Sequence, residues 1–361
     1  MDPTIDLGTR RVSYFRRLIT VALTFAIVIS TFYVLSIGQQ FFVPLVMAVL
    51  AVYLVDILSR FIRKLSVGGY GIPAAVSVML AFAIIFGLGF MLVEIIAHNA
   101  RQVAAAAPKY QIRLQQLQAG IFMKFGIEEP PELRQMLRTI DLGALFGAIA
   151  KQVAAVFEDV TLIVIYGLFI MLERRFIPIK VQALFPDPER RKNAIRIIRR
   201  IDRDIHTYLG VKTAVSLTSA LLAYALMRIV GLDFAEFWAL LVFVLHFIPT
   251  IGVIVATLLP SLLAAVQFDS LGPFLAIGIG ITAIAQFMGN IVEPNVMGET
   301  LNLSPLTVIF SLIVWGSVWG IVGAFLCVPL TVILVIVLSN FRATRWVSIL
   351  LSKTGEIRFS D

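Results

Sequence analysis

Charged side chains are scarce in this chain, and their scarcity identifies the solvent in which it folds. Only 14% of the 361 residues are charged and 59% are hydrophobic, whereas soluble domains carry about 25% charged residues. Several apolar runs reach the roughly 20 residues that a helix needs to cross a hydrocarbon core of about 30 Å. They lack the alternating polarity of barrel strands. The composition excludes a soluble globule and predicts an all-α polytopic membrane protein.

Cysteine and the common catalytic motifs are also missing. Cys327 is the single cysteine and lies inside an apolar run, which excludes a disulfide framework and a thiolate metal site. The chain has no Gly-rich phosphate loop, no His-Glu-x-x-His helix and no nucleophile elbow. We therefore expect no enzyme, no metal and no cofactor, and no ATP hydrolysis by this chain alone.

The net charge of +8 comes from basic residues beside apolar runs. Such residues set the orientation of a membrane protein, because cytoplasmic loops are enriched in Lys and Arg. We therefore expect no nucleic-acid partner and expect both termini in the cytoplasm. The first run, 18–37, is too long for a signal peptide and has no small-residue cleavage site, so we expect an uncleaved first span.

Hydropathy and charge divide the chain into about eight hydrophobic helical segments, some of them broken or re-entrant. We expect a cytoplasmic segment at 1–17, three transmembrane helices within 18–97, a small extracytoplasmic helical region at 98–152, a fourth transmembrane helix at 153–172, a basic cytoplasmic amphipathic helix at 173–210, a C-terminal membrane region with broken helices at 211–338 and a cytoplasmic tail at 339–361. The charges permit three crossings after 230, or one crossing with two re-entrant hairpins.

Two of these segments have alternative roles. The region 98–152 is expected to pack or oligomerise, with substrate gating as the alternative. Asp187 followed by Pro188 is typical of a helix start. The basic helix that follows is expected to lie against anionic lipid headgroups, with ligand binding as the alternative.

Prolines and glycines mark the expected breaks in the C-terminal region. The run 237–266 is too long for one simple crossing, and Pro249 with Gly252 predicts a kink or a hairpin there. The last run, 306–338, would be roughly 50 Å long as a straight helix and should bend, tilt or protrude. Its small residues predict close helix packing; they are Gly316, Gly320 and Gly323.

The polar stretch 286–302 is the preferred candidate site, chiefly because the other ionisable candidates lie near the ends of the apolar runs. Pro294 should prevent a regular helix, and Gly289 and Gly298 permit tight turns. Broken transporter helices expose groups that bind polar substrates or cations; an ordinary loop that caps two helices is the alternative. The expected substrate-binding side chains are Gln286, Asn290, Glu293, Asn295, His246 and Thr250.

The polar stretch also carries a resemblance to a known family. The string Gly289-Asn290-Ile291-Val292-Glu293-Pro294-Asn295-Val296-Met297-Gly298 is similar to the C-terminal signature of the autoinducer-2 exporter family of bacterial transporters. The strings 301–305, 316–330, 247–252 and 202–210 resemble it as well. The resemblance covers most of the chain and is strongest after Arg200.

This resemblance implies a multi-pass transporter of the bacterial inner membrane that forms a homo-oligomer. Members of the family are described as exporters of the signal autoinducer-2 or as sodium or lithium/proton antiporters. We therefore expect export of a small polar organic solute, with cation/proton antiport as one alternative and a membrane scaffold without transport as another. The expected partners are a small-molecule or cation substrate, membrane lipids and further copies of the chain.

Overall fold

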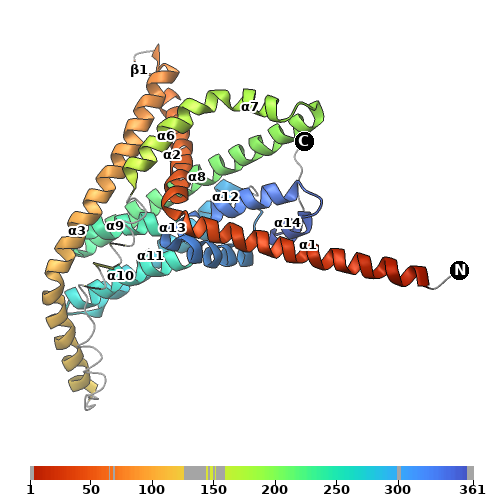
Figure 1. Cartoon of the computed structure of the whole chain (residues 1–361). Helices are drawn as coiled ribbons and strands as arrows, with labels where there is room; N and C mark the ends of the chain where they lie inside the picture. Colours follow the sequence, from red (N-terminus) through yellow and green to blue (C-terminus); the bar gives the residue numbers. More distant parts are fainter. Residues whose placement is uncertain are drawn as a thin grey trace.

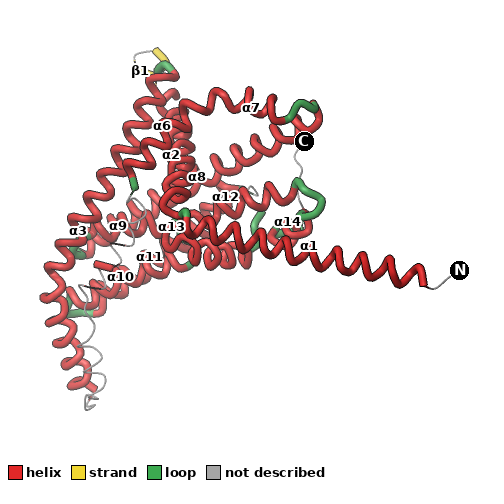
Figure 2. Tube along the Cα trace, in the orientation of Figure 1, coloured by secondary structure: helices red, strands yellow, loops and turns green. Residues whose placement is uncertain are grey.

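The structure is a computed structural model that describes residues 4–64, 66–67, 70–125, 144, 147–148, 151, 159–298 and 302–355. Nearly all of these residues are helical (Figure 2). Two short strands, β1 (Ser66–Val67) and β2 (Tyr70–Gly71), pair as one antiparallel hairpin. The prediction of an all-α polytopic membrane fold is confirmed.

The helices of the first half are α1 (Thr4–Ile37), α2 (Gln39–Lys64), α3 (Ala74–Phe125), α6 (Val160–Glu173), the 3-10 turn η1 (Arg174–Phe176), α7 (Ile177–Leu184) and α8 (Pro188–Val230). Those of the second half are α9 (Ala235–Leu245), α10 (Ile251–Gln267), α11 (Leu271–Phe287), the π-helical turn η2 (Met288–Val292), α12 (Glu293–Met297), α13 (Pro305–Ser339) and α14 (Arg345–Leu351). By length and composition alone, six segments of the described helices could cross a membrane: Ile19–Ile37, Gln39–Lys64, Ala74–Leu92, Pro188–Val230, Leu271–Met297 and Pro305–Ser339, the last of which is folded back on itself.

Helix α8 is the central element of the fold. It contacts α2, α9, α11, α12 and α13, and its 43 residues span roughly 65 Å. The predicted start at Asp187 is confirmed, because its carboxylate accepts a hydrogen bond from the Glu189 amide at 3.1 Å and Pro188 occupies the first turn. The basic segment and the apolar span that follows it therefore belong to one continuous helix.

Helices α9 and α10 form the first hairpin. The Gln267 side chain closes its base, since it accepts from the Asp233 amide and donates to the Gly231 carbonyl, both at 2.8 Å. At the tip, Thr250 has a φ of 59°. A Cβ at Gly252 would lie 1.9 Å from the Leu245 carbonyl oxygen. The break predicted at Pro249 and Gly252 is thus a tight reversal of the chain.

Helix α13 forms the second hairpin, because it reverses at Trp319 and Gly320, whose φ values are −126° and 60°. Its limbs, 305–318 and 321–339, lie side by side: the Trp315 indole donates to the Thr331 hydroxyl at 3.1 Å. Both ends meet α14, since Thr307 Oγ1 donates to the Leu351 carbonyl and Ser348 Oγ donates to the Val335 carbonyl. The expected bend of the last run is a complete reversal.

The two hairpins enter from opposite ends of α8 and meet at their tips. The base of the first hairpin contacts Gly231, at the C-terminal end of α8. Asn340, at the base of the second hairpin, lies beside the N-terminal part of α8. Between them, the rings of Phe247 and Phe325 stack at a centroid distance of 4.8 Å. The number of membrane crossings after α8 stays a prediction.

The polar stretch is an irregular helix, as Pro294 predicts, but the chain makes no tight turn at Gly289. The chain runs from α11 through the π-helical turn η2 into α12. The wider turn accommodates Pro294, which has no N–H to donate and stands in the first turn of α12. The helix ends at Gly298, whose φ of 61° suits glycine. Asn302 lies just beyond, and residues 299–301 lie outside the described residues.

The periphery consists of α1 and α3, which Figure 1 shows at the outside of the molecule, with α1 projecting away from the other helices. Large apolar side chains of both helices are exposed, for example Phe25, Ile29 and Met79, as expected for surfaces in contact with lipid. Tyr110 of α3 is buried and donates to Asp233 at 2.7 Å. The described part of the region 98–152 therefore packs on the first hairpin; most of the rest lies outside the described residues.

Candidate functional site

The candidate site is built around an ion pair between α8 and α12. The Lys212 ammonium lies 3.1 Å and 3.0 Å from the two carboxylate oxygens of Glu293. Both side chains are largely buried, with 11% of the Lys212 side chain and 18% of the Glu293 side chain exposed. A buried charge is costly unless it is paired, so each residue accounts for the presence of the other inside the membrane region.

Four polar side chains share one face of α8, and we call them the polar seam: Tyr208, Lys212, Ser216 and Ser219. Their spacing of four, four and three residues places them on one side of a helix, over roughly 16 Å of its length. Tyr208, Ser216 and Ser219 are each at most 2% exposed. Their hydroxyl groups make no hydrogen bond within the described residues.

A small cavity lies at one end of the polar seam. Its volume is about 10 Å³, and its polar lining side chains are Ser219, His246 and Thr257. They come from α8, from the tip of the first hairpin and from α10. The Thr257 hydroxyl, like that of Ser219, has no hydrogen-bond partner in the described part of the chain. The space suits about one water-sized group with hydrogen bonds to offer.

The second hairpin reaches the other end of the seam. Cys327 is fully buried and Ser311 is 4% exposed. The Lys212 ammonium lies within electrostatic reach of both Cys327 and His246, and the Tyr208 hydroxyl lies within reach of Glu293. The two hairpins and α12 thus converge on Lys212. Such an arrangement can bind a small polar molecule or a cation and exclude bulk water.

The structure brings together only some of the expected binding residues. Glu293 and His246 both face the seam region around Lys212. Gln286 and Asn290 are exposed and hydrogen-bond to each other, one helical turn apart. Asn295 and Thr250 are exposed as well. The roles predicted for these four side chains in substrate binding stay predictions.

The glycines of the second hairpin differ in what they do. A Cβ at Gly323 would lie 1.9 Å from the Trp315 carbonyl oxygen, so Gly323 permits the limbs to approach. A Cβ at Gly316 would lie 4.0 Å from the Ala324 Cβ on the second limb, which is an ordinary contact. Gly320 forms the turn itself, and a Cβ there would meet open space. In the described structure, Gly323 permits close packing within one hairpin, whereas Gly320 permits its turn.

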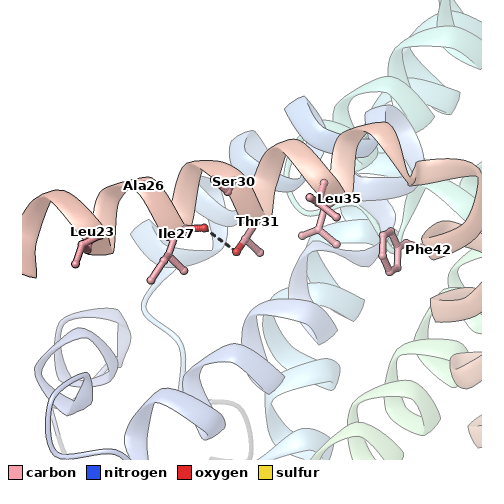
Figure 3. A pocket seen from close by; sticks show the side chains of 8 residues that line it. Leu23, Ala26, Ile27, Ser30, Thr31, Leu35 and Phe42 are labelled. Carbon is pink, nitrogen blue, oxygen red and sulfur yellow. Dashed lines mark hydrogen bonds between the residues drawn. The ribbon is translucent and has the colours of Figure 1, made fainter.

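A larger cavity of about 520 Å³ lies between α1 and α2, and Figure 3 shows its lining. The lining is mainly apolar, with Leu23, Ile27 and Leu35 on α1 and Phe42 on α2. The Thr31 hydroxyl donates to the Ile27 carbonyl within its own helix at 2.8 Å. This cavity offers a polar solute little to bind, so the polar seam remains the candidate site.

Sequence reasoning missed Lys212 and the hydroxyl groups of α8. The available signal was a lysine at the start of the apolar run 211–230, followed by serines at helical spacing. An average over this 20-residue run hides its two cations, Lys212 and Arg228. The pairing with Glu293 could not be found in the sequence, because 81 residues separate the two partners.

Comparison with known proteins places the chain among transport proteins. The family described as AI-2E family transporter matches residues 22–343. The AI-2 transport protein TqsA of Escherichia coli is 30% identical over 322 residues, which cover 87% of this chain and 90% of the relative. A relative in Haemophilus influenzae is 28% identical over 294 residues, which cover 80% of this chain and 84% of the relative. A relative in Borreliella burgdorferi is 34% identical over 183 residues, half of each chain.

Proposed function

Since this chain belongs to the AI-2E transporter family, we propose that it exports a small polar organic solute across the bacterial inner membrane without hydrolysing ATP. Its membership establishes a multi-pass protein of a transporter family. The solute, the direction and the membrane are our proposal, as are a homo-oligomeric state, bound membrane lipids and cytoplasmic termini. The name of the Escherichia coli relative makes autoinducer-2 the first solute to test.

The observation that supports export best is the set of buried hydroxyl groups on the polar seam. Tyr208, Ser216 and Ser219 are buried without hydrogen bonds within the described residues, although such burial costs roughly 1 to 3 kcal/mol per group. A solute with several hydroxyl or carbonyl groups would supply the missing partners while it passes along α8. The Lys212–Glu293 pair is neutral as a unit, which favours an uncharged solute.

The two hairpins supply the means to open the seam on one side at a time. Their bases lie at opposite ends of α8, and their tips meet at Phe247 and Phe325. Withdrawal of one tip would expose one end of the seam, while the other hairpin stays closed. A path of this kind avoids a continuous pore, which a solute exporter must not form.

Efflux from proteoliposomes tests the proposal. Vesicles are loaded with a panel of uncharged polar solutes that includes autoinducer-2, and wild-type protein is compared with the variant Ser216→Ala/Ser219→Ala. The matched control is Thr218→Ala, because Thr218 lies on the same helix but is exposed and bonds to the Ala214 carbonyl. We expect efflux of at least one solute, a roughly tenfold loss in the double variant and little change in the control. The proposal would be overturned if, for every solute, efflux from vesicles with the wild-type protein were no faster than efflux from loaded vesicles without protein.

Sodium or lithium/proton antiport is the second candidate, and the Lys212–Glu293 pair is the observation that favours it. Both Glu293 oxygens point at one ammonium group, and a bare alkali cation could replace that ammonium at the carboxylate. A pH-sensitive dye inside the vesicles would report the exchange. Sodium-dependent pH changes that are unaltered in Glu293→Gln vesicles would exclude Glu293 from this role.

A further inference from the structure

A second cavity, separate from the polar seam, lies beside the N-terminal part of α8. It has a volume of about 680 Å³ and is bounded by α8 on one side and by Asn340, at the end of α13, on the other. Six of its lining residues are cationic, and none is acidic. They are Arg191, Lys192, Arg196, Arg199, Arg200 and Arg203. We call this feature the basic cavity.

Most of this positive charge is not neutralised by acidic side chains of the described residues. Arg200 and Arg203 share the buried carboxylate of Asp204, at 3.7 Å and 3.3 Å. The other four cations have no acidic partner among the described residues; they are Arg191, Lys192, Arg196 and Arg199. Like charges held close together raise the free energy of the fold, so an anion that enters the cavity would relieve a repulsion already present.

The position of the cavity limits what that anion can be. Of the 43 residues of α8, about 20 suffice to cross the hydrocarbon core, and the apolar run 211–230 forms the C-terminal half of the helix. The basic residues then lie outside the hydrocarbon, at the level of the headgroups or the adjoining water. The cavity also has apolar walls, with Ile195 and Ile197 among its lining residues. Both features suit a phosphate group, free or attached to an acyl chain.

We propose that the basic cavity binds a ligand with at least two phosphate charges, supplied either by an anionic lipid headgroup or by a soluble phosphate compound. Arg guanidinium groups match phosphate oxygens with paired hydrogen bonds, and several of them around one cavity favour a multiply charged ligand over a single carboxylate. Basic pockets between membrane helices bind phospholipid headgroups of this kind. The site is independent of the transported solute.

Binding to the purified full-length protein in an uncharged detergent tests this. One arm titrates cardiolipin, with the zwitterionic lipid phosphatidylcholine, which has no net charge, as the reference, and the other titrates inorganic pyrophosphate. The test variant is Arg196→Gln/Arg199→Gln. The matched control is Arg175→Gln/Arg190→Gln, which removes the same charge from cations that do not line the cavity.

We expect at least one ligand to bind the wild-type protein, with affinity lowered tenfold or more in the test variant and less than threefold in the control. Loss confined to cardiolipin identifies a lipid headgroup, and loss confined to pyrophosphate identifies a soluble phosphate. Equal losses in both double variants would overturn the proposal, as would no binding in either arm. Because the test variant could misfold, Arg196→Lys/Arg199→Lys serves as a second variant: it keeps the charge but loses the paired guanidinium hydrogen bonds, and should bind more tightly than Arg196→Gln/Arg199→Gln and less tightly than the wild-type protein.

Discussion

Lys212 and Glu293 form an ion pair whose ammonium lies within 3.1 Å of both carboxylate oxygens. The pair joins the central helix α8 to the short helix α12, which follows the π-helical turn. Since the two side chains are largely buried, neither can lose its partner without leaving a charge in a medium that solvates it poorly. The pair therefore fixes the end of the polar stretch against the seam.

Removing one partner of this pair should destabilise the protein more than removing both. Glu293→Gln leaves the Lys212 ammonium buried and unpaired, at a cost of roughly 3 kcal/mol. The double variant Lys212→Met/Glu293→Gln removes both charges and should recover most of that loss. Apparent melting temperatures in detergent measure the difference. A double variant less stable than Glu293→Gln would contradict a stabilising role for the pairing.

The hairpin glycines should not tolerate alanine. A Cβ at Gly252 or Gly323 would lie 1.9 Å from a backbone carbonyl oxygen, so each hairpin must open to accept it. Gly252→Ala and Gly323→Ala should each lower the apparent melting temperature by several degrees and abolish transport. Gly87→Ala is the control, because that position has open space and alanine favours helix. Normal transport by Gly252→Ala would show that the tip adapts at little cost.

The Gln267 side chain should hold the base of the first hairpin. Gln267→Ala removes hydrogen bonds to the Asp233 amide and the Gly231 carbonyl, at about 1 kcal/mol each. We expect faster hydrogen exchange at the start of α9 and the end of α10, measured by mass spectrometry. The exposed Gln182 on α7 provides the control variant Gln182→Ala. Hydrogen exchange in Gln267→Ala that equals the wild-type rate would show that other contacts hold the base of the first hairpin.

Tyr110 should make the protein sensitive to alkaline pH. Burial and the hydrogen bond to Asp233 raise the pKa of Tyr110 above its usual value near 10. The folded state therefore keeps the proton longer than the unfolded state, and the stabilisation is complete below about pH 10 and lost as pH rises further. Tyr110→Phe should lower stability at neutral pH and flatten its decline above pH 10. Melting curves from pH 7 to 11 measure both effects; parallel curves for the two proteins would contradict this linkage.

The sequence was sufficient for the fold class and for the features that depend on local chemistry. Asp187 with Pro188 predicts the start of α8, because a helix start is specified by adjacent residues. Pro249 with Gly252 predicts the first reversal for the same reason. The reversal at Trp319 and Gly320 was expected only as a bend, because that run has no proline near its turn and Gly320 alone carries the positive φ.

Contacts between segments that lie far apart in the chain could not be predicted from the sequence. Pro294 correctly indicates an irregular helix, but it does not reveal whether the chain opens into a loop or widens into a π-helical turn. The polarity of Gln286 and Asn290 predicts a role in substrate binding, yet the two side chains hydrogen-bond to each other on the exposed side of the helix. Lys212 was overlooked, because its importance arises from a contact with a distant segment rather than from its neighbours in sequence.

The unbroken length of α8 has a consequence for where the protein sits in its membrane. Lys212 is the thirteenth residue after Arg199, and no described interruption of the helix lies between them, so the two side chains start from points roughly 20 Å apart along one axis. Whatever holds the basic end at the membrane surface therefore fixes how deep Lys212 lies below it. Because α8 is continuous, the position of its basic end determines the depth of the Lys212–Glu293 ion pair in the bilayer.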